Sequence, residues 1–580
     1  MSKRLSRLSQ AAAWLLLAAV FAYVCRFLSR KIDFLLNADM SSVLVVSKML
    51  QQEGALLTPN FYYSTWPYVI SMQLVFAPLF CLTGNWHVVR LAGTAILLLI
   101  YLACAYALCR QLKLRRWFPL AGIMLLLPLS DAYMEMYITG VFYISHTCIV
   151  FGLLALSLRL LQKPRVRTGV LLYALGGFLS VAAGMEGLRI LLVYCLPMLL
   201  ASVLWYWYCH KRQQPLEQPR RLLSFNGFCC AACLAGVVIC LLVLEKRLHM
   251  QSQTSLSFTP FSFQNLGLIF QDWLGALGYR SGAAFSMTLV FNALALLLAV
   301  LMVGLIAASL RRKSDLPIQQ RLAGWFLAAA YLVYALLYVF TDQFYSWRYQ
   351  LPFLMVFFCL LPAACQNWRA GPRVRAAAAA AFMALFGLCG LRLYREYGML
   401  DYSGEHIDIA NAMVEQGYTY GYSQFWYPGN TLTELSDGQL RWYYWFDLEE
   451  MPGRRIPCLS TWYRHVNAGD VGVRYGETPY HPNRKPKGPR PHPAMTVPGR
   501  LVLDDRPAGA TKRSRFGHYE MDTVVSSTNG TGGLPVLVDR RSRRYVVEKL
   551  EHVTQDEVVK ALKRMIRRKA LGKALSVTTD

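Results

Sequence analysis

"SFNGFCCAACLAGVVICLLVL" (Ser224–Leu244) decides the fold class, because it runs for 21 residues without a charged side chain. An α-helix needs about 17–25 mostly apolar residues to cross the hydrocarbon core of a bilayer. Cys230 and Cys233 form a lone CxxC, with no second pair at zinc-site spacing. We interpret these cysteines as small buried hydrophobic residues. The stretch is therefore predicted to be a membrane-spanning helix.

Similar apolar stretches lie on both sides of it. The chain of 580 residues is 55% hydrophobic, with a mean hydropathy of +0.32, which is more apolar than a usual soluble globular chain. The basic start "MSKRLSRLSQ" leads into the first stretch and shows no cleavable signal pattern. Residues 1–391 are therefore expected to form an all-α polytopic membrane bundle. We predict about 11 transmembrane helices, near 11–28, 91–109, 117–130, 142–158, 169–185, 188–208, 224–244, 286–309, 322–340, 350–366 and 376–391.

The charge of the connecting loops predicts their orientation. Alternate loops are rich in Lys and Arg, namely 110–116, 159–167, 210–221, 311–321 and 369–375. Because cytoplasmic loops carry an excess of these residues, we expect them on the cytoplasmic side together with the basic N-terminus. This requires the apolar stretch 69–84 to lie in the membrane interface without spanning. The chain is thus predicted to be a multi-pass protein of the cell membrane, with residues after 391 extracytoplasmic.

The loops expected on the outer side collect the unusual polar residues. The first of them carries Asp33 and Asp39 soon after the first span. It contains "LNADMSS" and "LLTPNFYYSTW", and "FYISH" and "SWRYQLP" follow near later spans. With the topology, these motifs resemble the C-type superfamily of membrane glycosyltransferases over roughly residues 1–450. No nucleotide-binding P-loop is present in the sequence.

The resemblance implies an enzyme that takes a sugar from a polyprenyl-phosphate carrier in the lipid bilayer. On the family pattern Asp39 is the catalytic or metal-binding acid, and a divalent metal is possible at the first outer loop. Asp33 could equally be that acid, so the choice between the two stays open. Arg348 is expected to bind the carrier phosphate, since a guanidinium group holds phosphate through two hydrogen bonds.

Ordinary structural roles stand beside these assignments. Asp39 could be a helix N-cap or a solvated loop acid, and Arg348 could be a cation at the membrane interface. His146 could bond a neighbouring helix, and Glu186 could be a charge at the membrane edge. A transporter or a non-enzymatic membrane protein is the alternative for the whole region, although no internal repeat is present.

The chain changes character after the membrane region. Residues 392–452 mix aromatic and polar residues with turn signals at "YPGN" and "SDGQ", which predicts an extracytoplasmic β-rich cap. After Pro452 the composition becomes basic, with 25 Lys and Arg against 12 Asp and Glu in residues 453–580. Residues 453–512 are expected to hold one basic helix and a proline-rich cationic linker, a partial DNA-binding region.

Residues 513–580 show an α/β pattern. We predict strands in "GHYEMDTVVSS", "LPVLVDRRSR", "RYVVEKLEHV" and "ALSVTTD", and a helix in "TQDEVVKALKRMIRRKA" with Thr554 as N-cap. The order β-β-β-α-β is the start of the ribonuclease-H-like fold, in which the first and fourth strands lie side by side. Asp522 on the first strand and Asp580 on the fourth would then meet. Asp539 is interpreted as part of a strand end and a solvated turn.

"RSRFGHYEMDTVV", "GGLPVLVDRRSRRYVVEKL" and "LSVTTD" resemble the catalytic core of DDE transposases of the insertion-sequence 30 family. The resemblance covers roughly residues 453–580. It implies phosphodiester transfer on DNA with Mg²⁺ or Mn²⁺, held by Asp522 and Asp580 as catalytic and metal-binding acids. The third acid of that family follows on a later helix, which would lie beyond Asp580.

Taken together, the sequence predicts a composite chain from a bacterial source. A membrane glycosyltransferase-like protein is expected up to about residue 452, joined to a truncated α/β ribonuclease-H-like transposase core. The transposase part is expected to be inactive, because its acid set is incomplete and because an extracytoplasmic segment does not reach the chromosome.

Overall fold

The computed structural model describes residues 3–63, 66–162, 164–250, 257–261, 263–281, 287–311, 313–341, 347–423, 428–444, 507–525 and 532–579. The chain divides into two compact units, Met1–Ile456 and Pro457–Asp580. The division lies close to the boundary predicted at residue 452, where the composition changes. The basic helix expected just after Pro452 lies outside the described residues.

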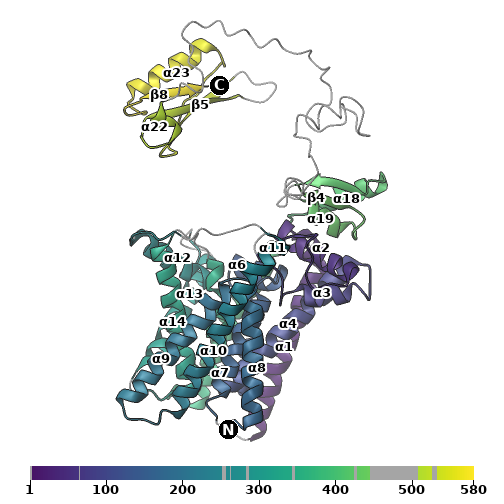
Figure 1. Ribbon diagram of the computed structural model, residues 1–580, viewed down its shortest axis with the longest axis vertical. Coiled ribbons are helices and arrows are strands. Elements are labelled where there is room, and N and C mark those ends of the chain that lie inside the picture. The colour runs from purple at the N-terminus through teal and green to yellow at the C-terminus, as the bar shows by residue number, and fades with distance from the viewer. Residues whose placement is uncertain are drawn as a thin grey trace. The chain divides into compact units, whose positions relative to one another are not determined.

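The first unit is a bundle of long helices (Figure 1). Within the described residues, nine helices are long and apolar enough to cross a membrane. They comprise α1 (Lys3–Lys31), α4 (Trp86–Gln111), α8 (Val166–Gly184), α9 (Leu196–Lys211), α10 (Glu217–Ile239), α13 (Met287–Leu310), α14 (Ile318–Phe340), α15 (Leu351–Leu360) with α16 (Pro362–Asn367), and α17 (Pro372–Tyr397). The π-helical turns η4 (Leu191–Cys195) and η5 (Cys240–Leu244) extend α9 and α10, and α11 (Glu245–Arg247) follows η5. The chain is a multi-pass membrane protein.

The two other predicted spans are shorter helices. The first, α5 (Phe118–Leu126), follows the 3-10 turn η2 (Arg115–Trp117) and precedes α6 (Asp131–Tyr133) and the π-helical turn η3 (Met134–Thr139). The helical segments Arg115–Leu126 and Asp131–Thr139 meet at a bend of 105°. At the bend, Pro128 supplies no backbone donor and Ser130 caps α6. The second, α7 (Ile144–Arg159), is apolar but has only 16 residues. Each of the eleven predicted segments thus coincides with a helix.

Short elements gather at the end of the bundle opposite the N-terminus (Figure 1). They are η1 (Ile32–Phe34), α2 (Ala38–Glu53), β1 (Tyr62–Tyr63), α3 (Gln73–Leu79), β2 (His249–Met250), α12 (Phe263–Ala276) and η6 (Trp347–Gln350). The strands β1 and β2 pair in parallel. Helix α3 has only seven residues and contains Pro78, so the prediction that 69–84 does not span the membrane is confirmed. We call this end of the bundle the loop end.

The interior of the bundle is apolar and closely packed. Tyr101 stacks on Phe151 with their ring centroids 5.7 Å apart. Cys229, Cys230 and Cys233 are free and buried, which confirms their interpretation as small hydrophobic residues.

The segment expected to be a β-rich cap is mainly helical where it is described. It contains α18 (Gly404–Glu415) and α19 (Gly429–Leu435), with one parallel pair of short strands, β3 (Tyr420–Ser423) and β4 (Arg441–Tyr444). A small cluster of Ala410, Leu432 and Leu440 forms its core. Of the two turn signals that predicted a β-rich cap, the first begins α19, with Pro428 as N-cap and Gly429 as first residue, and Gly438 of the second follows α19 with a positive φ of 77°.

The described part of the second unit is a four-stranded sheet with one long helix. The strands β5 (His518–Val525), β6 (Gly533–Asp539), β7 (Tyr545–Val547) and β8 (Ser576–Thr579) lie in the order β7-β6-β5-β8, and α22 (Ala508–Thr511) and α23 (Gln555–Arg567) complete it. The predicted side-by-side pairing of the first and fourth strands is confirmed, because β5 and β8 pair in parallel. Thr554 caps α23 as predicted, accepting a hydrogen bond from the Glu557 amide. Met565 of α23 packs with Tyr519 and Leu537 against one face of the sheet.

Asp539 departs from the prediction of a solvated turn. It is 3% exposed, and its carboxylate accepts hydrogen bonds from the amides of Gly517, Arg541 and Ser542. Although burial opposes ionisation, these hydrogen bonds lower the pKa of Asp539. Asp539 therefore holds the β6–β7 turn to the start of β5.

Candidate functional site

Asp39 lies in the first turn of α2, at the loop end of the bundle. The N-cap of α2 is Asn37, whose side-chain oxygen accepts a hydrogen bond from the Met40 amide. Asp39 is therefore not the N-cap, and its half-buried carboxyl is free of that role. The Asn37 side chain also donates to Glu135 Oε1 at 3.0 Å, which joins the first turn of α2 to η3. This contact brings together two acids that lie far apart in the sequence.

The electrostatic surroundings of Asp39 disfavour its charged form. Burial and the nearby negative charge of Glu135 raise the pKa of Asp39 to about 6, and Arg348 opposes the rise. A carboxyl with this pKa is largely ionised at neutral pH and can still accept a proton readily. Asp39, Glu135 and Arg348 thus form an acid–arginine cluster, and we use this name for the three residues.

Arg348 belongs to η6, the turn that begins the span of α15. Its guanidinium lies over the Tyr349 ring, 5.3 Å from the centroid. Tyr143, just before α7, is close enough to interact electrostatically with both Arg348 and Arg189. The predicted phosphate-binding arginine Arg348 therefore lies within electrostatic range of the predicted acid Asp39, and Tyr143 links it to a second arginine, Arg189.

Arg189 extends the cluster along the loop end. Its guanidinium lies between the rings of Trp66 and Tyr143, 4.1 Å and 5.0 Å from their centroids. The His146 ring packs edge-on against Trp66 at 5.6 Å. Among the described residues, no hydrogen-bond partner is found for four buried atoms of this group: Trp66 Nε1, Tyr143 Oη, His146 Nδ1 and Arg189 Nη1. Polar atoms and aromatic rings thus lie next to the acid–arginine cluster.

Glu186 and His146 hold the first outer loop in place. Glu186 is buried, and its Oε1 accepts hydrogen bonds from the amides of Val69 and Ile70, both at 2.8 Å. Its Oε2 lies 3.3 Å from His146 Nε2. These contacts support the structural alternatives that the sequence left open for His146 and Glu186. They fix the segment that carries Trp66 against the bundle.

Asp33 has partners of its own. Its carboxylate contacts His87 Nδ1 at 2.8 Å, and its backbone carbonyl accepts a hydrogen bond from Ser403. These contacts tie the end of α1 to α4 and to the cap. Of the two acids that the sequence could not separate, Asp39 is therefore the one in the acid–arginine cluster.

The cap clamps the start of α2 through a buried ion pair. Glu434 of α19 bonds Arg90 of α4 through both carboxylate oxygens, and neither residue is more than 4% exposed. Arg90 Nη2 also donates to the Met40 carbonyl at 2.8 Å, and Asn430 donates to the Ala38 carbonyl at 3.4 Å. The backbone carbonyls of Ala38 and Met40, the two neighbours of Asp39 in the sequence, thus accept hydrogen bonds from the cap and from α4. We call Arg90 and Glu434 the cap clamp.

The sequence interpretation missed two residues of this site. Glu135 lies in "SDAYMEMYITG", between the predicted spans 117–130 and 142–158, and Arg189 follows Glu186. An acid in an outer loop between two spans was the available signal for Glu135. Its contact with Asn37 depends on the bend between α5 and η3, which residue spacing does not predict.

A divalent metal at the first outer loop would need carboxylate ligands. Among the described residues, no three His, Cys, Asp or Glu side chains are grouped to hold a metal ion. Mg²⁺ is commonly held by only one or two carboxylates together with substrate phosphates. Asp39 and Glu135 offer two carboxylates that influence each other electrostatically, and the divalent metal at the first outer loop stays a prediction.

The predicted metal acids of the second unit are only partly described. Asp522 is exposed on β5, and its carboxylate accepts a hydrogen bond from the Thr523 amide at 2.7 Å. Glu520 pairs with Arg540. The β5–β8 pairing extends to Met521 and Thr579, and Asp580 lies outside the described residues. The meeting of Asp522 and Asp580 therefore stays a prediction.

Comparisons with known proteins give likenesses only at the level of structure. No protein-family model matches the chain, and no curated protein matches it. Cupriavidus metallidurans ArnT, solved with bound undecaprenyl phosphate, is similar with a TM-score of 0.48 and 15% identity, over 78% of this chain and 90% of ArnT.

The oligosaccharyltransferase of Archaeoglobus fulgidus is also similar. Its apo form gives a TM-score of 0.41 and 12% identity, over 73% of this chain and 64% of that one. The form tethered to an acceptor peptide with the NVT sequon gives a TM-score of 0.42 and 11% identity, over 74% of this chain and 63% of that one. Likenesses with TM-scores below 0.5 carry no conclusion about the activity of this chain.

Proposed function

We propose that residues 1–452 form a C-type glycosyltransferase that moves a sugar from a polyprenyl-phosphate carrier at the extracytoplasmic face of the membrane. The observation that carries the proposal is the acid–arginine cluster: a half-buried Asp39 with a pKa of about 6, beside Glu135 and Arg348. It lies at the loop end, opposite the basic N-terminus, which we place in the cytoplasm by the charge of the loops. The motifs that resemble the family, "LNADMSS" and "SWRYQLP", carry Asp39 and Arg348.

The chemistry of such a transfer requires these residue types. An acceptor hydroxyl attacks the anomeric carbon, the new carbon–oxygen bond forms, and the bond from that carbon to the carrier phosphate oxygen breaks. The acceptor proton passes to Asp39, which acts as general base. The electron pair leaves with the carrier phosphate, whose charge Arg348 stabilises. With Asp39 as the base, a divalent metal at the first outer loop would be held by Glu135 and the carrier phosphate and would supply additional stabilisation of the phosphate charge.

The pH dependence of transfer tests the proposal. Purified protein is assayed for release of sugar from a polyprenyl-phosphate sugar between pH 4 and 9. Because Asp39 acts in its ionised form, kcat is expected to rise with pH through about 6. In Glu135→Gln the like charge is removed, the pKa of Asp39 falls, and the rise is expected at lower pH.

The matched control for this shift is Glu405→Gln, which removes an acid from the first turn of α18 in the cap. Its pH profile is expected to match that of the unchanged protein. Absence of sugar release at every pH would contradict the proposed activity and favour the transporter alternative. If sugar is released but Glu135→Gln leaves the pH profile unchanged, the role of Asp39 is contradicted and the transfer activity is not.

We further propose that residues 453–580 are related to the catalytic core of an insertion-sequence transposase, as the sequence resemblance implies. The observation that favours it is the parallel pairing of β5 with β8, which puts the strand of Asp522 next to the strand that precedes Asp580. On this proposal the two acids hold Mg²⁺ or Mn²⁺, and the partner is DNA.

A strand-transfer assay tests this second proposal. The resemblance assigns only Asp522 and Asp580 to a site that needs three acids, so transfer of terminal-repeat DNA by the 580-residue polypeptide with Mg²⁺ or Mn²⁺ is expected to be undetectable. Weak binding of DNA, falling steeply with salt, is expected from the basic residues 453–580. Robust strand transfer would overturn the expectation of inactivity.

A further inference from the structure

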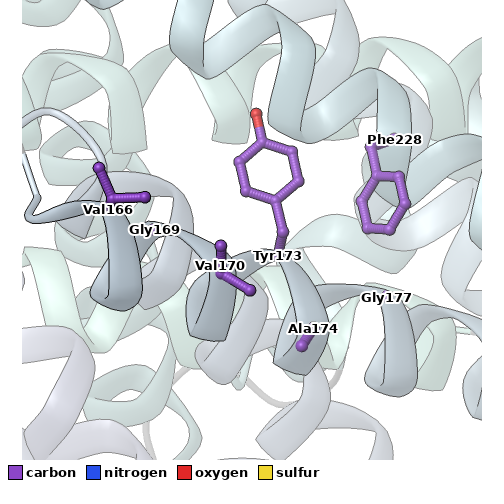
Figure 2. Close-up of a pocket in the computed structure, with 7 residues that line it drawn as sticks. All are labelled: Val166, Gly169, Val170, Tyr173, Ala174, Gly177 and Phe228. Carbon is purple, nitrogen blue, oxygen red and sulfur yellow. The ribbon is translucent and has the colours of Figure 1, made fainter.

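An apolar groove runs along the membrane-facing surface between α8 and α10 (Figure 2). Residues of α8 from Val166 to Gly177 line it, with Phe228 of α10 beside them. An α-helix rises 1.5 Å per residue, so these eleven steps span about 16 Å. Val170 is 66% exposed, which shows that the groove opens away from the bundle. In a spanning helix this surface faces lipid.

Glycines explain both the groove and its end. Farther along the two helices, a Cβ on Gly184 would meet the Cys233 carbonyl at 2.1 Å, and one on Gly236 would meet the Val181 carbonyl at 2.1 Å. The helices therefore touch closely there. Nearer the start of α8, Gly169 leaves its surroundings open, because a Cβ there would meet only Pro164 Cγ, at 3.9 Å.

Helices α8 and α10 run parallel. A polar contact lies between their N-terminal ends and the region around Gly184 and Gly236 where they touch closely. Gly176 lies against Phe225, and Gly184 against Cys233, so residue numbers rise together along both helices. Tyr173 Oη donates to Ser224 Oγ at 3.2 Å. Val166 is about two turns before this contact on α8, and Arg220 is about one turn before it on α10.

The end of the groove at the helix starts is positively charged. Arg165 and Arg167 flank Val166 in the sequence and are exposed, as is Arg220. Among the described residues, none of these three side chains has an ion pair or hydrogen bond, whereas Arg221 pairs with Glu217 at 3.3 Å. The groove therefore combines an apolar channel with free cations at one end.

We propose that this groove binds an anionic phospholipid of the bilayer. One acyl chain lies in the groove along α8 against Phe228, and the headgroup phosphate contacts Arg165 and Arg167. Charge complementarity selects this occupant, because a zwitterionic lipid fills the channel equally well but gains less from unpaired arginines. Each Lys or Arg near the surface of an anionic membrane contributes about a five-fold gain in affinity. The site is independent of the acid–arginine cluster and of the proposed transfer.

The test is lipid binding to the whole protein. Delipidated protein in detergent is titrated with dioleoyl phosphatidylglycerol or dioleoyl phosphatidylcholine, and the first lipid adduct is measured by native mass spectrometry. Phosphatidylglycerol is expected to bind at least about five-fold more tightly than phosphatidylcholine, and Arg165→Gln with Arg167→Gln is expected to remove this preference. A Cβ at Gly169 has room, so Gly169→Leu places an apolar side chain in the groove and is expected to weaken both lipids.

The matched control is Arg115→Gln with Arg116→Gln, which removes the same charge from the exposed turn η2 before α5. It is expected to leave the preference for phosphatidylglycerol unchanged. Equal affinity for both lipids in the unchanged protein would overturn the proposal, as would an equal loss in the control pair. A dimer that Gly169→Leu abolishes would show that a second copy of the chain occupies the groove instead.

Discussion

Sugar transfer is expected to fall by about 10²–10⁴-fold in Asp39→Asn, the range that general-base catalysis usually contributes. Asparagine keeps the size of the side chain and cannot accept the acceptor proton. Its neutral amide also removes the attraction between Asp39 and Arg348. The loss is expected in kcat more than in KM, because the proton moves only as the bond to the acceptor forms. The measurement is steady-state release of sugar from the carrier at pH 8, where the Asp39 carboxyl is ionised in the unchanged protein.

Asp33→Asn is the matched control for that loss. It makes the same chemical change six residues earlier, in a residue that contacts His87 at 2.8 Å and not the acid–arginine cluster. Its transfer rate is expected to stay within about three-fold of the unchanged protein, since a half-exposed pair of this kind contributes little. If Asp33→Asn loses activity and Asp39→Asn keeps it, the assignment of the catalytic acid is wrong. Equal losses in both would indicate that the loop, and not the Asp39 carboxyl, sets the rate.

The spans could be predicted because their signal is local. A stretch such as Ser224–Leu244 carries its own evidence, and the charge of adjacent loops decided that 69–84 does not span. Asp39 and Arg348 were also predicted from the sequence, through the family resemblance. Their neighbours were not, because Glu135 reaches Asn37 across a separation of 98 residues. Such a contact depends on how the helices pack, and residue patterns carry no record of it.

The cap shows how a local signal can mislead. The aromatic residues and turn signals between 418 and 444 favoured strands, but in the described residues 418–423 and 428–444 only β3 and β4 are strands. Helix α18 was missed, although Ala410 and Met413 of "GEHIDIANAMVE" recur at helical spacing and Gly417 follows with a positive φ of 80°. The pattern of charges along the sequence likewise does not predict that Glu434 is buried, because its partner Arg90 lies 344 residues away in the sequence.

Breaking the cap clamp is expected to destabilise the first unit strongly. Glu434→Gln leaves the buried guanidinium of Arg90 without a counter-charge, and removing one partner of a buried ion pair costs about 3–5 kcal/mol. The Arg90 side chain would also hold the Met40 carbonyl less firmly, so Asp39 is expected to lose its fixed position. The midpoint of unfolding by added SDS, for protein purified in mild detergent, and the kcat for sugar transfer are measured together. Both are expected to fall.

Two further variants separate the charge from the position of α2. Asp437→Asn is the matched control, because its side-chain oxygen can still accept the hydrogen bond of 2.7 Å from the Trp86 amide. Its stability and activity are expected to be unchanged. The double variant Arg90→Met with Glu434→Leu removes both charges and is expected to recover most of the stability, since apolar replacements of buried pairs are often neutral. It still lacks the donor to the Met40 carbonyl, so kcat is expected to stay low. Full recovery of kcat in the double variant would show that the clamp only stabilises the cap and does not position Asp39.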